Sequence, residues 1–131
     1  MSIQVHWSEK YEHIIIYKMQ GAWTWSEYAE AFKEELNLVN QQDTPPYDVI
    51  ADLLEAIPFP GLSGLNVLYT TYQQSPQTLG TVILVSRSTA LKQFVRFAAM
   101  VFPDMTTILV VSSLAQAYDV ILHNRQKQNS A

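Results

Sequence analysis

Three short runs of apolar residues, each followed by a segment with helical periodicity, constrain the fold of this chain most. They occupy residues 47–53, 81–85 and 107–111, and the second run is apolar almost without interruption. A strand with apolar side chains on both faces must be covered on both sides, and parallel pairing requires a crossover between strands. The alternation therefore predicts an α/β fold in which helices cover both faces of a largely parallel sheet.

The N-terminal segment carries the signals of an antiparallel hairpin. Ile3, Val5 and Trp7 alternate with polar residues, as in a strand that buries one face. A β-branched run follows over residues 13–19, and Gly21 ends it. Because only a short polar turn separates the two runs, we expect them to pair with each other.

Four segments have apolar residues at the spacing of an amphipathic helix. The first begins at Thr24, three residues before Glu27, which is the pattern of a capping box. The second begins near Ser63, and the third and fourth begin at the capping residues Ser88 and Ser113. The predicted order is β-β-α-β-α-β-α-β-α, a single-domain mixed sheet with four helices.

Length and composition fit one domain. The chain has 131 residues, of which 48% are hydrophobic, and this is enough to bury a core without disulfides or metals. We expect the domain to span residues 1–126 and a polar tail over 127–131 to fray. The absence of cysteine excludes disulfides, thiolate nucleophiles and Cys-ligated metal sites.

Charge and hydropathy exclude two classes of partner. A formal net charge of -4 argues against nucleic-acid binding, which usually requires a basic surface. The first residues lack the features of a signal peptide, and the longest apolar runs are far too short to cross a bilayer. We therefore expect a cytoplasmic protein that binds neither nucleic acid nor membrane.

No motif in the sequence specifies an enzyme, a cofactor or a metal. Neither a dinucleotide-binding nor a phosphate-binding glycine loop is present. His6 and His13 lack cysteine or carboxylate partners for a metal. An enzyme would have to use Asp52 and Glu55 with a hydroxyl such as Ser63, and nothing in their spacing requires that. We predict a noncatalytic protein without cofactor or metal.

Two further acidic residues, Glu34 and Glu35, lie in the middle of the first predicted helix. We place both on its solvent face, where charged side chains of an amphipathic helix normally lie.

Residues 52–68 resemble the signature of the STAS family, whose founding members are anti-sigma factor antagonists of the SpoIIAA type. In that signature a strand ends in Asp-Leu-Ser, a short loop follows, and Asp-Ser-Ser-Gly-Leu opens the next helix. Here Asp52 matches the strand-end aspartate, and Ser63, Gly64 and Leu65 match the start of the helix. The leading hairpin and the alternation of helices and strands are also similar to that family.

The C-terminal part extends the resemblance. Residues 101–118 are similar to the corresponding segment of divergent SpoIIAA-like bacterial proteins of the STAS/SEC14 type. Three positions differ from the antagonist signature, because Leu54, Gly61 and Leu62 stand where it has serine, aspartate and serine. The loop is also one residue longer.

The resemblance implies a regulatory module that contacts a partner protein, such as a kinase or an anti-sigma-type regulator, through residues 57–65. Ser63 matches the serine that a partner kinase phosphorylates, and a phosphate there adds about 1.5 to 2 negative charges beside free backbone N–H groups. From the residues themselves, our first interpretation of Ser63 is an ordinary helix N-cap, worth about 1 kcal/mol, and the phosphorylated serine is the alternative.

Apolar side chains in the loop favour the same surface. Ile57, Phe59 and Leu62 are costly to leave in water, and such residues often mark contact surfaces. The predicted partner-binding residues are Asp52, Ile57, Phe59, Ser63, Gly64 and Leu65. A homodimer is also expected, since small α/β regulators often bury an apolar face symmetrically.

The alternative function is binding of a small hydrophobic ligand or lipid in the manner of SEC14-type proteins. The resemblance suggests it, and so do five aromatic residues, Trp23, Trp25, Phe94, Phe97 and Phe102. Such a function requires an enclosed apolar cavity of about 300 Å³ or more.

Overall fold

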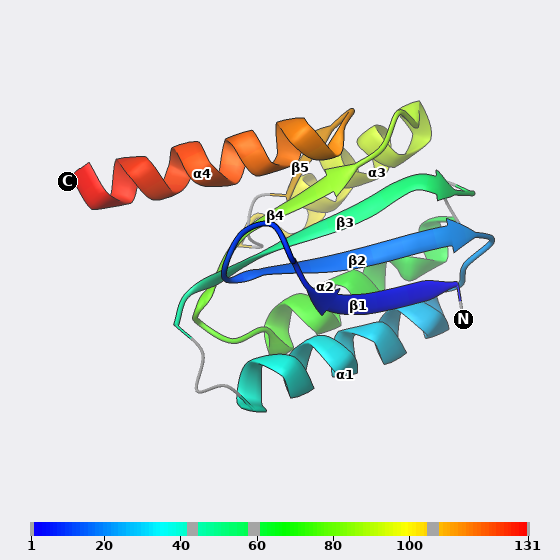
Figure 1. Ribbon diagram of the computed structural model, residues 1–131. Coiled ribbons are helices and arrows are strands. Elements are labelled where there is room, and N and C mark those ends of the chain that lie inside the picture. Colours follow the sequence, from blue (N-terminus) through cyan, green and yellow to red (C-terminus); the bar gives the residue numbers. More distant parts are fainter. Residues whose placement is uncertain (1, 42–44, 58–60, 105–107, 131) are drawn as a thin grey trace.

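A computed structural model of the chain shows a five-stranded sheet with helices against both faces (Figure 1). The structure describes residues 2–41, 45–57, 61–104 and 108–130. The strands are β1 (Ile3–Trp7), β2 (Ile14–Gly21), β3 (Tyr47–Ala56), β4 (Leu79–Val85) and β5 (Ile108–Val111). They lie in chain order in the sheet, with β1 antiparallel to β2 and all other neighbours parallel. The predicted mixed sheet is confirmed; Thr107, which we assigned to the last strand, lies outside the described residues.

The helices are α1 (Trp25–Gln41), α2 (Leu65–Gln74), α3 (Thr89–Val101) and α4 (Leu114–Ser130), and a short 3₁₀ turn, η1 (Leu62–Gly64), precedes α2. Three predicted caps are confirmed, because Thr24, Ser88 and Ser113 each accept a hydrogen bond at 3.1 Å from the backbone N–H three residues later. The order of strands and α-helices is the predicted one. No helix in the described part of the chain is long and apolar enough to cross a membrane.

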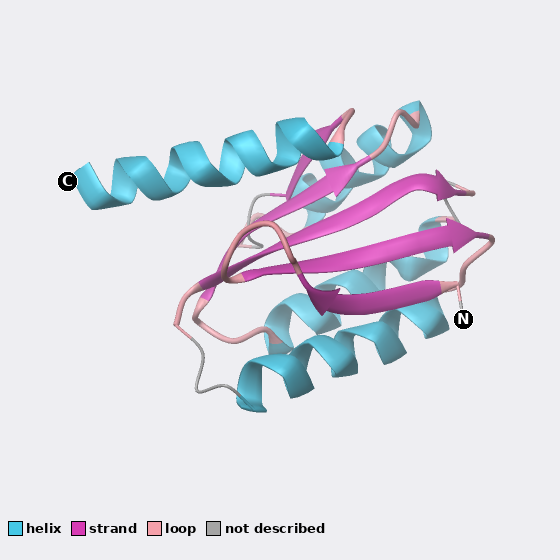
Figure 2. Cartoon of the chain, in the orientation of Figure 1, coloured by secondary structure: helices cyan, strands magenta, loops and turns pink. Residues whose placement is uncertain are grey.

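Alternating side chains of the central strands build two separate cores. On β2, Ile15, Tyr17 and Met19 join the cluster formed with α1 and α3, whereas Ile14 and Ile16 join the cluster formed with α4. Figure 2 shows the sheet between α1 and α2 on one side and α4 on the other. Burial on both faces explains why these strands are apolar at almost every position.

Helix α4 is longer than the sequence predicted. It continues to Ser130, so residues 127–130 of the expected frayed tail are helical. No proline or glycine interrupts this segment, and Arg125 attaches it to the body of the fold.

Arg125 joins α4 to two other parts of the structure, β3 and the turn between β1 and β2. Its Nη2 and Nε lie 2.9 and 3.1 Å from Asp48 Oδ2, and its guanidinium also donates to the carbonyl oxygens of Glu12 and His13 at 2.9 Å. The second Asp48 oxygen accepts the backbone N–H of Thr81 at 2.7 Å. Asp48 is therefore a buried carboxylate with a full set of partners.

We expect Arg125→Met to lower the free energy of unfolding by about 2 kcal/mol, since the change leaves a buried carboxylate without its cation. Urea unfolding measures the difference. The matched control is Lys33→Met, which breaks an exposed pair with Glu30 and should change stability by less than about 0.5 kcal/mol. Equal unfolding midpoints for the two variants would show that the pair of Arg125 with Asp48 contributes no more to stability than the exposed pair.

Candidate functional site

Two tryptophans before and at the start of α1 hold the segment that follows β3. The indole N–H of Trp23 donates to the carbonyl oxygen of Ile57 at 2.9 Å, and that of Trp25 donates to Gly61 at 3.0 Å. The two rings meet edge to face with their centroids 5.0 Å apart. The backbone is thus fixed at residue 57 and again at residue 61.

Ile57 exposes its side chain although its backbone is held. It is 60% exposed, and Leu54, near the end of β3, is 41% exposed. Phe59, which we predicted to belong to the same surface, lies outside the described residues, and so does the side chain of Leu62. Of the predicted apolar contact surface, the structure therefore describes Ile57, and Leu54 on β3 is a second exposed apolar residue three positions before it.

Ser63 does not cap α2, so the N-cap interpretation is wrong. The N-cap residue is Gly64, and no side chain caps this helix; Ser63 lies in η1 and is exposed. Gly64 packs against the Trp25 ring, because a Cβ on Gly64 would lie 1.8 Å from Trp25 Cε2. Only glycine allows this close approach, and α2 begins directly after it at Leu65.

Asp52 and Ser63 do not form one site. Asp52 is buried on the α4 side of the sheet, two residues after Ile50, which packs in the α4 core. Helix α2, which follows Ser63, packs against the opposite face (Figure 1). Of the other predicted residues, Gly64 lies against Trp25 and Leu65, the first residue of α2, is half-buried.

A change of strand register brings Asp52 together with Glu55 instead. Lys18 pairs with Asp52 and Gln20 with Glu55, so β3 has one extra residue between the pairs and both carboxylates reach the same lysine. Lys18 Nζ lies 3.2 Å from Asp52 Oδ2 and 3.0 Å from Glu55 Oε2. Hydrogen bonds from Gln20 and Lys18 lower the pKa of Glu55.

Lys18, Asp52 and Glu55 form an ion-pair network in which each charged group has a partner. Asp52 Oδ1 also accepts the backbone N–H of Leu54 at 3.1 Å, and the hydrogen bond to Glu55 raises the pKa of Lys18. The three side chains that an enzyme would have needed, Asp52, Glu55 and Ser63, are therefore not assembled around one point. No group of three or more potential metal ligands occurs among the residues that the structure describes.

Comparison of the chain with models of known protein families and with curated protein sequences finds no match.

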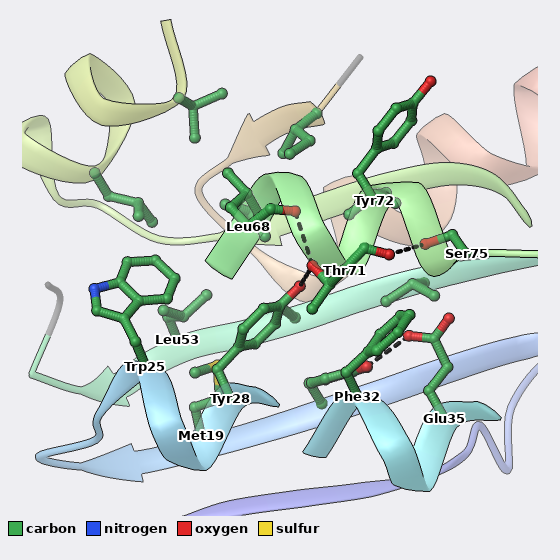
Figure 3. A pocket seen from close by; sticks show the side chains of 18 of the residues that line it. Met19, Trp25, Tyr28, Phe32, Glu35, Leu53, Leu68, Thr71, Tyr72 and Ser75 are labelled. Carbon is green, nitrogen blue, oxygen red and sulfur yellow. Dashed lines mark hydrogen bonds between the residues drawn. The ribbon is translucent and has the colours of Figure 1, made fainter. Parts of the chain in front are cut away.

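A cavity of about 110 Å³ lies between the sheet and the helices α1, α2 and α3 (Figure 3). Trp23, Trp25 and Phe94 line it, as the ligand-binding alternative requires, but Phe97 is 46% exposed and Phe102 stacks on Tyr69. The volume is near one third of that needed for a lipid or a drug-sized molecule, so it does not favour SEC14-type lipid binding.

Glu35 borders this cavity and is buried, so our placement of it on the solvent face is wrong. It is 3% exposed, and its two carboxylate oxygens accept hydrogen bonds from the hydroxyls of Tyr17 at 2.5 Å and Tyr47 at 2.7 Å. The signal was present in the sequence, because Glu35 occupies the i+7 position of the apolar stripe that contains Tyr28 and Phe32. Glu34 is exposed, as expected.

Burial dominates the electrostatics of this group. It raises the pKa of Glu35 although both hydrogen bonds oppose the change. Burial, together with the nearby carboxylate, also raises the pKa of Tyr17 and Tyr47. Burial raises the pKa of Tyr28 to about 12.

Ser63→Ala should change the free energy of unfolding by less than about 0.5 kcal/mol, because the hydroxyl caps no helix. Gly64→Ala should lower it by about 2–3 kcal/mol, since the new methyl group overlaps the Trp25 ring. Urea unfolding distinguishes the two neighbours. A loss near 1 kcal/mol for Ser63→Ala would restore the N-cap interpretation.

Glu35→Gln should remove a pH dependence of stability. A pKa raised in the folded state means that the folded protein binds the proton more tightly, so the free energy of unfolding falls as pH rises above the ordinary value of 4.5. The fall is at most about 1.4 kcal/mol per pH unit and ends at the folded-state pKa.

The variant should therefore gain stability relative to the wild type between pH 4.5 and pH 7. Urea unfolding at several pH values measures this gain, and Glu34→Gln is the exposed control, for which no gain is expected. Parallel pH profiles for wild type and Glu35→Gln would show that the carboxyl is not perturbed.

Proposed function

We propose that this protein is a noncatalytic regulatory module that binds a partner protein through the tryptophan-anchored surface, defined as Ile57, Gly61 and Ser63. One observation carries the proposal: Ile57 is 60% exposed although its carbonyl oxygen is bonded to the buried Trp23. An apolar side chain on a backbone that is already fixed loses little conformational entropy when a partner covers it.

The contacts of Trp25 support the inclusion of Ser63 in this surface. Trp25 bonds Gly61 on one side of Ser63 and touches Gly64 on the other. Because the Ser63 side chain is exposed and caps no helix, its hydroxyl is accessible to a modifying enzyme. A phosphate of about 1.5 to 2 negative charges would oppose the docking of an apolar partner on Ile57.

The resemblance to the anti-sigma factor antagonists supports a regulatory protein as the partner. Their order of elements is similar to the order observed here, and the surface that we propose follows the strand and precedes the helix that match their signature. We therefore propose a kinase or an anti-sigma-type regulator as the partner, in the cytoplasm. The homodimer stays a prediction.

Ile57→Asp should abolish binding of the partner, because a charge at the centre of an apolar contact must be desolvated. The control is Met100→Asp on α3, which adds the same charge at a residue that is 80% exposed. Each variant and the wild type carry an affinity tag and are recovered from the cells that produce the protein. The partner should be recovered with the wild type and with Met100→Asp only.

Photo-crosslinking localises the contact independently. A crosslinking side chain at position 57 should attach to the recovered partner, and the same group at position 100 should not. Thermal unfolding confirms that the variants are folded. Equal recovery with Ile57→Asp, or crosslinks from position 100 alone, would exclude this surface.

A further inference from the structure

The polar side chains that line the cavity between the sheet and α1–α3 are hydrogen bonded within the protein. The hydroxyl of Thr71 donates to the backbone carbonyl oxygen of Leu68 at 2.8 Å. The hydroxyl of Ser75 donates to the backbone carbonyl oxygen of Thr71, also at 2.8 Å. Since the Thr71 proton is used, the 3.2 Å contact between Tyr28 and Thr71 is a bond that Tyr28 donates. Figure 3 shows these side chains around the cavity.

The other polar N–H and O–H groups that line the cavity also donate hydrogen bonds within the protein. Tyr17 donates to Glu35, and Tyr72 donates to the carbonyl oxygen of Asp104. Both indole N–H groups donate to the loop after β3. A molecule in the cavity can therefore receive no hydrogen bond from the described lining side chains without breaking one, so any hydrogen bond that it makes to them is one that it donates.

Glu35 is the strongest acceptor there. A carboxylate offers about four lone-pair positions, and the tyrosine hydroxyls fill two of them. The ion pairs of the described residues join His13, Lys18, Lys33 and Arg125 to other carboxylates, and none of these pairs includes Glu35. This buried carboxylate is stabilised by neutral donors alone, although a cation would stabilise it more.

Aromatic rings form much of the remaining wall. Trp25 contacts Tyr28 and Phe94 with ring centroids 5.9 and 5.5 Å away, and Phe32 is a further lining residue. In Figure 3, Trp25 and Glu35 lie at opposite ends of the group of labelled side chains. Ring faces attract cations, and their apolar area suits a hydrocarbon group.

We propose that this cavity binds a small primary amine as its ammonium ion, with the nitrogen at Glu35 and the hydrocarbon group between the aromatic rings. A dry apolar cavity of about 150 Å³ accepts benzene. The cavity of this protein, at about 110 Å³, therefore fits a hydrocarbon group of about four to six carbon atoms. An ammonium ion also favours the ionised form of Glu35, whose pKa burial raises. The proposal does not depend on the partner-binding surface.

The experiment titrates butylammonium into the protein at neutral pH and follows the NMR signals of the Met19 methyl group and the Trp25 indole, two residues that line the cavity. The wild type and Glu34→Gln should bind equally, because Glu34 is exposed on the same helix. Glu35→Gln should weaken binding by about ten-fold or more, since a charge-assisted hydrogen bond is lost. The neutral analogue 1-butanol should bind more weakly than butylammonium to the wild type, and Glu35→Gln should weaken its binding less than that of butylammonium, because no ion pair is lost.

A second variant tests the location without changing the charge. Ala51→Leu fills the cavity while Glu35 is retained, and it should also remove butylammonium binding. Circular dichroism confirms that both variants are folded. Undiminished binding to Glu35→Gln or to Ala51→Leu, no binding to the wild type, or stronger binding of 1-butanol would each overturn the proposal.

Discussion

The structure depends on the burial of β2, β3 and β4 on both faces. Apolar side chains point alternately into the two cores, so the helices must lie on both sides and the sheet cannot form without them. The same constraint makes every polar side chain in these layers expensive. The partners of three buried carboxylates, Glu35, Asp48 and Asp52, compensate for their loss of hydration.

The three carboxylates have different partners. Asp48 is paired with Arg125, and Asp52 with Lys18, so each has a cation within 3.2 Å. Glu35 has two tyrosine hydroxyls. A carboxylate compensated by neutral donors beside an aromatic cavity is an expensive arrangement for structure alone, and this contrast is the basis for assigning a cationic ligand to it.

The tryptophan pair connects the core to the candidate partner surface. Trp23 and Trp25 pack under the start of α1 and hold the backbone after β3 through their indole N–H groups. Trp25 also lines the cavity and requires glycine at position 64. The Trp25 side chain therefore contacts the residue before α2, holds the backbone at Gly61 and forms part of the cavity wall.

Much of the fold could be predicted because its signals are local. A strand buried on both faces needs apolar residues in succession, and a helix N-terminus needs an acceptor such as that of Ser88 or Ser113. The prediction failed at Glu35, because we took the residue type as the guide rather than its position in the apolar stripe, which indicates burial.

The sequence by itself therefore determined the order of the elements, the pairing of the hairpin and three of the helix caps, since these follow from neighbours in the chain. Only the tertiary structure decided that Asp52 faces away from Ser63, that Gly64 rather than Ser63 precedes α2, and that Glu35 borders a cavity. Each of these depends on a contact between distant segments, such as the Trp25 ring against Gly64. No local pattern encodes which side chain will occupy that space.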